Sequence, residues 1–329
     1  MTRALAMISG GLDSILAAKL IKDQGIEVIG ICFKSYFFSE ESARKMVKQI
    51  DIPLEVIDFS NEHMDMIKNP KHGFGKNMNP CIDCHAMMMR YSGDMLKKFD
   101  ADFIITGEVL NQRPMSQNRQ ALNIVKKESG FSDKILRPLC AKNLEPTEME
   151  LKGLVNRENL LDICGRSRKT QIELADKWNI KEYPSPAGGC KLTEPNYAIR
   201  LKDLLNSKSD ATDDEISLLR YGRHLRVDKN TKIISARTGE EGKGIKKYID
   251  KNYIMFLVSN FSGSLVVLRG EETEKNIMLG ARMAARYSKG RNEKEIEVKY
   301  GNFGSKFTKH KIVNAISDEE ISKYLISIK

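Results

Sequence analysis

Short apolar runs alternate with amphipathic segments over the first third of the chain. Residues 4–8 are all apolar, and from Ile15 to Ile21 apolar positions recur every three or four residues, as in a helix with one buried face. The alternation continues with strands expected at 27–33, 54–57 and 102–106, and helices expected at 40–49 and 87–99. This rhythm predicts an α/β fold with a doubly wound parallel sheet, which binds ligands at the carboxyl ends of its strands.

The pattern changes twice further along the chain. Residues 130–205 are rich in loops and proline, and the polar stretch 207–214 (SKSDATDD) is typical of a linker. Beyond it we expect strands at 253–258, 264–268 and 295–299, and a helix at 274–287. The sequence therefore predicts an α/β domain at 1–206, a linker at 207–214 and a smaller α+β domain at 215–329.

A glycine-rich segment, SGGLDS at 9–14, lies between the first expected strand and the first expected helix. Glycines there let the backbone approach an anion, and the free amides of a helix N-terminus favour negative charge. The lysine of a Walker loop is absent, and so is the pattern G-x-G-x-x-G. The segment is interpreted as a phosphate-binding loop of another type.

Hydropathy and charge indicate where the protein acts and what kind of partner it binds. No apolar run reaches the roughly 18 residues of a transmembrane helix, and the N-terminus lacks a signal-peptide pattern, so we expect a cytoplasmic protein with no membrane partner. Residues 1–210 carry 31 basic and 28 acidic side chains, whereas residues 211–329 carry 23 and 16. The basic excess in the C-terminal third indicates a polyanionic partner, nucleic acid above all.

Six cysteines suggest metal or redox chemistry. Cys81 and Cys84 form a C-x-x-C-H segment, and Cys190 follows the pair Gly188-Gly189. The residues alone leave several interpretations open: a haem attachment site, half a zinc site, a redox dithiol, or three ligands of a [4Fe–4S] cluster with one open iron. The remaining three are expected to be small buried side chains: Cys32, Cys140 and Cys164.

Six segments together resemble the adenylating domain of the tRNA 4-thiouridine synthase family, and more broadly the PP-loop tRNA thiolases, including the 2-thiouridylases. They span roughly residues 1–205: SGGLDS, NPCIDCH, GEVLNQRPMSQ, ILRPLCAKNLEPTEME, LLDICGRSRKTQIELA and YPSPAGGCKLTEP. The resemblance implies that ATP adenylates a uridine carbonyl oxygen of tRNA and that sulfur then displaces AMP. Members with three cysteines in this arrangement use an iron–sulfur cluster, which would make Cys81, Cys84 and Cys190 its ligands and part of the catalytic machinery.

The resemblance also implies a nucleotide site. Asp13 would be catalytic and would help to hold Mg²⁺, and adenine would lie near Ile8 and Phe33. The ATP-binding residues implied are Ser9, Gly10, Gly11, Asp13, Ser14, Phe33, Gly107, Glu108 and Gln112.

Two departures from the family change what we expect of RNA and sulfur. The 4-thiouridine synthases typically carry an N-terminal THUMP domain, and this chain starts at the loop, so we expect RNA recognition elsewhere. The chain also has no appended rhodanese domain. The sulfur donor is therefore sulfide or the persulfide of a cysteine desulfurase.

The C-terminal third resembles the NFACT-R RNA-binding domain through FSGSLVVLRG (261–270), GARMAARYSKGR (280–291) and EIEVKYG (295–301), with Leu265 in place of the usual histidine. The expected RNA contacts are Arg269, Arg282, Arg286, Lys289 and Arg291, with Tyr287 as a stacking platform. Two alternatives stay open at this point. One is a PP-loop ligase that activates a small carboxylate, and the other is an RNA-binding accessory factor with an inactive loop.

Overall fold

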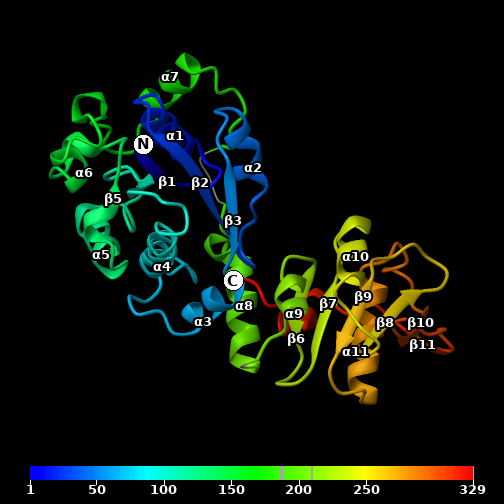
Figure 1. The fold of residues 1–329 in the computed structure, drawn as a ribbon. Helices are drawn as coiled ribbons and strands as arrows, with labels where there is room; N and C mark the ends of the chain where they lie inside the picture. Colours follow the sequence, from blue (N-terminus) through cyan, green and yellow to red (C-terminus); the bar gives the residue numbers. More distant parts are fainter. Residues whose placement is uncertain (186–188, 209, 329) are drawn as a thin grey trace. The chain divides into compact units, whose positions relative to one another are not determined.

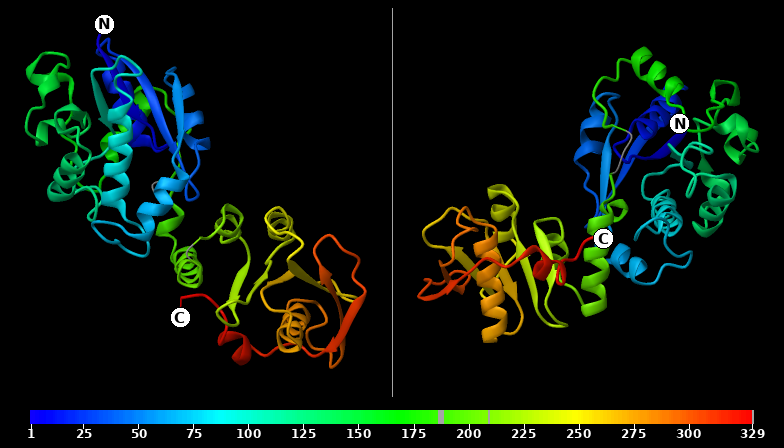
Figure 2. Two further views of the ribbon diagram at one scale, coloured as in Figure 1. Left: turned by 60° about the horizontal axis from the view of Figure 1, so that its bottom comes forward. Right: turned by 180° about the vertical axis from the view of Figure 1, so that it is seen from behind.

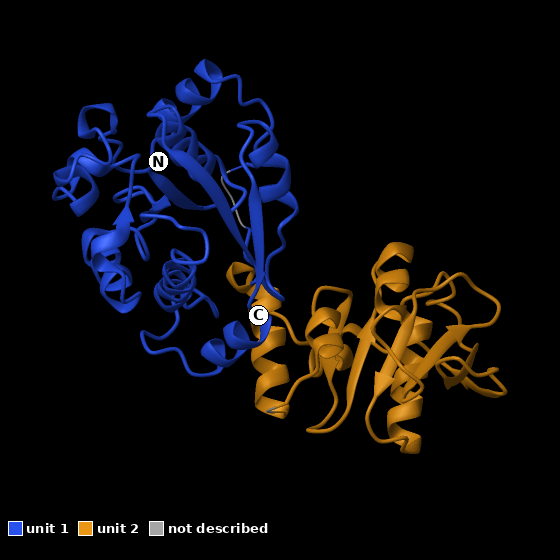
Figure 3. Ribbon diagram, in the orientation of Figure 1, with its two compact units in different colours: residues 1–191 blue, residues 192–329 orange. Residues whose placement is uncertain are grey.

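The computed structural model describes residues 1–185, 189–208 and 210–328, and the chain divides into two compact units, 1–191 and 192–329 (Figure 3). The division precedes helix α8 (Pro195–Ser207), whereas the composition shift placed it at residue 206. The polar stretch expected as a linker joins α8 to α9 (Asp213–Leu218) inside the second unit. Its residue 209 lies outside the described residues.

A parallel sheet forms the centre of the first unit (Figure 1). Its five strands run in the order β3-β2-β1-β4-β5, and all four pairings between neighbours are parallel. The strands are β1 (Arg3–Met7), β2 (Glu27–Lys34), β3 (Leu54–Asp58), β4 (Phe103–Thr106) and β5 (Ile135–Leu136). The doubly wound α/β architecture predicted from the sequence is confirmed.

Helices cover both faces of this sheet, because alternate residues of each strand point to opposite sides (Figure 2). Ala4 and Ala6 of β1 belong to the cluster that holds helices α1 (Leu12–Lys22), α2 (Glu41–Lys48) and α7 (Lys169–Lys177). Leu5 belongs to the opposite cluster. That cluster packs α4 (Cys81–Asp94) and α5 (Arg119–Glu128). The first unit also contains helices α3 (Ser60–Lys68) and α6 (Glu148–Leu151).

Helix α4 differs from its expected bounds of 87–99, since it begins at Cys81 and ends at Asp94. Pro80 is its N-cap residue. Proline is tolerated there because the helix does not use the backbone N–H that proline lacks. The C-x-x-C segment therefore occupies the first turn of the helix. Two thiols three residues apart consequently lie on one helical face.

The second unit is built on an antiparallel sheet of six strands in the order β11-β10-β8-β9-β7-β6. The strands are β6 (Arg223–Arg226), β7 (Lys232–Ser235), β8 (Tyr253–Val258), β9 (Val266–Arg269), β10 (Ile296–Asn302) and β11 (Lys309–Val313). Helix α11 (Glu274–Arg286) packs on one face and α10 (Gly239–Lys246) on the other. Helix α12 (Asp318–Ser322) follows β11. The smaller α+β domain is thus confirmed, although β6, β7 and β11 were not predicted.

No helix within the described ranges is both long and apolar enough to span a bilayer.

A histidine lies inside the aromatic core of the first unit. The side chain of His63 is fully buried, and its ring stacks on Phe59 with 4.8 Å between the centroids. Phe37 and Phe38 contact it from other sides, at centroid distances of 5.4 and 5.5 Å. Neither ring nitrogen has a hydrogen-bond partner among the described residues. Burial therefore lowers the pKa of His63 to about 4.

Acid should consequently destabilise the first unit through His63. The neutral ring is favoured in the folded state, so its stability contribution is complete above pH 6.5 and is lost as pH falls toward 4. A difference of this size is worth at most about 3 kcal/mol of unfolding free energy. The substitution His63→Phe keeps an aromatic ring and removes the titration. Urea denaturation at pH 7.5 and 4.5 should show a smaller acid loss in the variant, and equal losses would contradict this account.

Candidate functional site

The glycine-rich loop at residues 9–14 connects the carboxyl end of β1 to α1. Ser9 Oγ accepts a hydrogen bond from the Gly11 N–H at 3.3 Å, and Ser14 Oγ donates to the Gly11 carbonyl at 2.7 Å. Gly10 has φ +80°, and a Cβ there would lie 2.6 Å from Ser42 Cβ. Gly11, the N-cap of α1, offers no side-chain cap. The amides at this helix start are therefore suited to an anionic ligand.

Asp13 is held by a chain of amide side chains. Its Oδ2 accepts a hydrogen bond from Gln112 Nε2 at 2.7 Å, and Gln112 Oε1 accepts one from Gln171 Nε2 at 3.0 Å. The second carboxylate oxygen, Oδ1, is buried and has no partner among the described residues. A buried, unpaired carboxylate oxygen is a suitable ligand for a hard cation such as Mg²⁺. The structure thus brings together Asp13 and Gln112, which the sequence analysis assigned to one site.

Gly107 follows β4 and lies directly against the start of α1. A Cβ at this position would be 2.5 Å from the Ser14 amide nitrogen and 2.6 Å from the Asp13 carbonyl carbon. No side chain fits between these backbones. The glycine is therefore required for the contact between the two segments that form this end of the sheet.

Glu108 forms a buried charged cluster. Its side chain is only 4 % exposed, and Arg137 Nε and His85 Nδ1 lie 2.9 and 2.8 Å from its two carboxylate oxygens. Burial opposes the charged form, but Arg137 and His85 outweigh it and lower the pKa of Glu108 to about 2. Both carboxylate oxygens thus have partners within the protein. Of the two partners, His85 is the more exposed, at 28 % against 5 % for Arg137.

The residues expected near adenine are buried in the core. Ile8 is 2 % and Phe33 5 % exposed. The Phe33 ring packs against Phe59 and Tyr91, with centroids 5.3 and 6.4 Å away. The Phe33 side chain therefore packs inside the core and does not present a free surface to a ligand.

The three cysteines singled out by the sequence lie in one neighbourhood. Burial raises the pKa of the Cys84 thiol well above its ordinary value, and Cys190 and Cys81 raise it further. Burial also raises the pKa of Cys81, although Arg113 and a hydrogen bond from Asn79 oppose this. Gly188, the first residue of the glycine pair before Cys190, lies outside the described residues. Across the described chain, His, Cys, Asp and Glu side chains form no group of three or more that could hold a metal ion.

The remaining cysteines follow the prediction only in part. Cys32 and Cys140 are buried, as expected. Cys164 is exposed, so its expected burial was wrong. The apolar run around it ends at an isolated bridge between Cys164 and Leu110, and the Asn111 side chain reaches its sulfur at 3.6 Å. Local hydrophobicity indicated a core position that the packing does not provide.

The basic residues of the second unit differ in their partners. Arg282 and Arg286 form ion pairs with Glu320 and Asp318. The Arg269 guanidinium lies 5.6 Å from the centre of the Tyr253 ring. By contrast, Lys289, Arg291 and Tyr287 line a common pocket. Leu265, which replaces the histidine expected from the resemblance, is buried in that pocket's lining.

Two residues of the first site were missed at the sequence level. Arg137 follows β5 directly, and an ionisable residue after a buried strand is a usable signal at the carboxyl edge of a sheet. Gln171 is fully buried on α7 and had no such signal, because its neighbours in sequence are typical of an exposed helix.

These features define the class of the first unit. A parallel sheet with SGGLDS at its carboxyl end resembles the PP-loop ATPase-like fold. Residues 1–148 match the family model of the thiamine biosynthesis protein ThiI. Residues 222–325 match the model of the NFACT protein RNA binding domain. The chain thus joins a ThiI-type PP-loop segment to an NFACT-type segment, as its motifs predicted.

Individual proteins are also similar to this chain. The tRNA-specific 2-thiouridylase MnmA 1 of Clostridium botulinum (strain Okra / Type B1) is 34 % identical over 199 residues, covering 55 % of this chain and 51 % of that protein. The tRNA-specific 2-thiouridylase MnmA of Malacoplasma penetrans is 24 % identical, covering 80 % and 77 %. A solved 4-thiouridine synthetase–RNA complex with bound ATP is 16 % identical at a TM-score of 0.36, covering 54 % and 52 %. The chain spans about half the length of the first curated relatives that it matches.

The close approach at Gly107 gives a test of how this site is assembled. Gly107→Ala should destabilise the protein by about 1–3 kcal/mol, because the new methyl group must displace backbone at Asp13 and Ser14. Gly11→Ala is the matched control, since its Cβ would meet nothing closer than 3.5 Å. It should stay within about 0.5 kcal/mol of the wild type. Chemical denaturation measures both, and equal effects would refute the packing argument.

Proposed function

We propose that this protein is an ATP-dependent tRNA thiolase, which adenylates a uridine carbonyl oxygen and replaces it with sulfur. The observation that carries the proposal is Asp13 in the SGGLDS loop, which has one carboxylate oxygen that is buried and has no partner among the residues that the structure describes. The match to the ThiI model, the 2-thiouridylase relatives and the NFACT-type segment support tRNA as the substrate. A tRNA-modifying enzyme of this kind would act in the cytoplasm.

The first step transfers AMP. The uridine carbonyl oxygen attacks the α-phosphorus of ATP, the bond from this phosphorus to the bridging oxygen breaks, and pyrophosphate leaves. The loop amides and the hydroxyl groups of Ser9 and Ser14 would hold the departing phosphates. Asp13 would hold Mg²⁺ through Oδ1, and the ion would neutralise phosphate charge. Gln112 and Gln171 would keep the Asp13 carboxylate in position.

The second step brings sulfur to the activated carbon. Sulfur bonds to the ring carbon, and AMP leaves with the former carbonyl oxygen. Sulfide as donor makes this exchange redox neutral. A cysteine persulfide instead requires a second thiol, which forms a disulfide with the first, and an external thiol must then reduce that disulfide. Cys81, Cys84 and Cys190 are the proposed sulfur-handling residues because Cys81 and Cys84 share the first turn of α4 and Cys190 contributes to the raised pKa of the Cys84 thiol.

A [4Fe–4S] cluster on these three cysteines belongs to the same proposal as a holder of sulfide. The donor chemistry suits it, since iron in such clusters is bound by cysteine thiolates. The described residues do not fit it as they stand, because they form no group arranged to hold a metal ion. The side chains would have to rearrange around a cluster, so no step is assigned to it.

The two alternatives predict different products. A ligase for a small carboxylate would exchange pyrophosphate in the presence of that acid and would not respond to tRNA. An accessory factor with an inactive loop would release none. The Asp13 oxygen that has no partner among the described residues argues against an inactive loop. The basic pocket of the second unit argues against a small carboxylate as the substrate. Pyrophosphate release that depends on bulk tRNA identifies the thiolase, and pyrophosphate exchange with added carboxylic acids separates the ligase from the accessory factor.

Asp13→Asn should lower tRNA-dependent formation of AMP and pyrophosphate by about 100-fold or more, because a cation ligand at the reacting phosphates loses its charge. Asp23→Asn at the other end of α1 is the control, since Asp23 pairs with Lys19 far along the helix. That variant should retain wild-type turnover. Chromatography of the nucleotides and a thermal melt measure turnover and folding separately. ADP as the product, or unchanged turnover in Asp13→Asn, would end the PP-loop proposal.

The cysteine proposal is tested after anaerobic reconstitution with iron and sulfide. Replacement of Cys81, Cys84 or Cys190 by Ala should abolish thiolation while AMP formation persists, and should remove about one four-iron cluster per chain. Cys164→Ser is the control, because this exposed thiol lies outside the proposed group. Iron-free protein that thiolates tRNA and forms a disulfide to Cys190 would replace the cluster with the persulfide route.

A further inference from the structure

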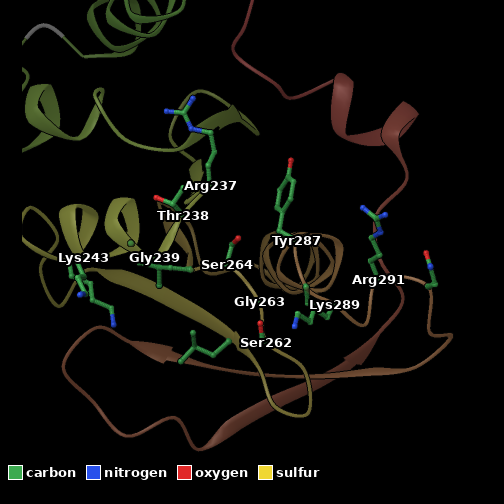
Figure 4. A pocket seen from close by; sticks show the side chains of 16 residues that line it. Arg237, Thr238, Gly239, Lys243, Ser262, Gly263, Ser264, Tyr287, Lys289 and Arg291 are labelled. Atoms are coloured by element: carbon green, nitrogen blue, oxygen red, sulfur yellow. The ribbon is translucent and has the colours of Figure 1, made fainter.

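A large pocket lies in the second unit, beside the carboxyl end of α11. It has a volume of about 890 Å³ and is lined by residues of α10 and the two residues before it, of β8, of the loop before β9 and of the segment after α11 (Figure 4). This volume falls in the range that accommodates small-molecule or nucleotide-sized groups. All of its lining residues belong to the second unit.

Backbone hydrogen bonds hold one wall of the pocket. The Lys289 N–H donates to the Ser262 carbonyl at 2.9 Å, and the Ser264 N–H donates to the Tyr287 carbonyl at 3.0 Å. Between them, Gly263 and Ser288 form an isolated antiparallel bridge. The loop before β9 and the end of α11 are therefore joined, so that Lys289 and Tyr287 have fixed backbone positions.

The charge in the pocket is not neutralised. Lys243, Lys246, Lys289 and Arg291 all line it, and among the described residues none has a carboxylate within salt-bridge distance. Arg237 is the exception, since it pairs with Glu241. On the outer side of α11 the arginines are ion-paired instead. Four unpaired cations around one hollow indicate a ligand with more than one negative charge.

An aromatic side chain stands among these cations. Figure 4 shows Tyr287 between Arg237 and Arg291 at the edge of the pocket. The Arg223 guanidinium lies 4.7 Å from the centre of the Tyr287 ring, so the ring is already held by a cation–π contact. The exposed side chain of Leu257 adds an apolar patch to the lining. Cations beside a planar ring and an apolar patch suit a phosphate chain with a base attached.

We propose that this pocket binds an unpaired, single-stranded segment of the RNA substrate, with phosphates at Lys243, Lys246, Lys289 and Arg291 and one base against Tyr287. A base-paired duplex keeps its bases stacked inside and cannot present one to a tyrosine in a hollow. The inference rests on the proposed function for the identity of the RNA. It goes further by locating the contact and by excluding the ion-paired Arg282 and Arg286 from it.

The test measures binding of a fluorescent eight-nucleotide single-stranded RNA to the full chain. Lys289→Gln/Arg291→Gln should weaken binding about tenfold and reduce the slope of log affinity against log salt by about 1.4, which corresponds to two lost phosphate contacts. Lys229→Gln/Lys275→Gln removes the same charge from exposed positions outside the pocket and is the matched control. It should change affinity less than twofold.

A second pair of variants separates a nucleotide from a phosphate chain alone. Tyr287→Ala should weaken RNA binding by about 5- to 100-fold through lost stacking, while binding of inorganic polyphosphate stays unchanged. Tyr287→Phe should bind RNA like the wild type. Equal losses in the pocket and control double variants would overturn the proposal. So would a parallel loss of polyphosphate binding in Tyr287→Ala, or tighter binding of an RNA duplex than of the single strand.

The proposed function can fail independently of this site. ATP-to-AMP turnover depends on the first unit and is measured without the RNA-binding variants. If the wild-type protein binds the single strand but shows no ATP-to-AMP turnover, the proposed thiolase function is refuted and the pocket assignment is unaffected. Thermal melts of each variant exclude unfolding as the cause of weaker binding.

Discussion

The close approach of the residue after β4 to the first turn of α1 is the constraint on which the first site depends. Backbone atoms of Asp13 and Ser14 occupy the space that any side chain at Gly107 would need. Because the two segments meet this closely, the loop at residues 9–14 and the residues after β4 form one surface, and Gln112 reaches Asp13. The helix start that would face phosphate is therefore placed by backbone packing and not by a side-chain cap.

A buried charge links the carboxyl end of the parallel sheet to the helix that carries Cys81 and Cys84. Glu108 follows β4, Arg137 follows β5, and His85 lies on α4 one residue after Cys84. A carboxylate so deeply buried is tolerated only with charged partners that offset its lost hydration. The pairing that satisfies Glu108 thus also orients the first turn of α4. The segment after β4 consequently contacts both the start of α1, through Gly107, and the helix that carries Cys81 and Cys84, through Glu108.

In the second unit, ion pairing decides which basic residues are available. Net charge indicates only that a polyanion is a plausible ligand. Arg282 is neutralised by Glu320 across 38 residues of sequence, whereas Lys289 and Arg291, a few residues further on, face a hollow with no carboxylate nearby among the described residues. The distinction depends on where α12 packs, which no local pattern reveals.

The sequence by itself determined the features that local order encodes. Hydrophobic periodicity predicted four strands of the parallel sheet, and it placed SGGLDS between the first strand and the first helix. Tertiary structure decided burial and pairing: Phe33 is in the core, Cys164 is exposed, and Gln171 reaches Gln112 across 59 residues. The physical reason is the separation in sequence between the residues that interact. A helix or strand forms from contacts between near neighbours, whereas hydration and hydrogen-bond partners depend on segments that only folding brings together.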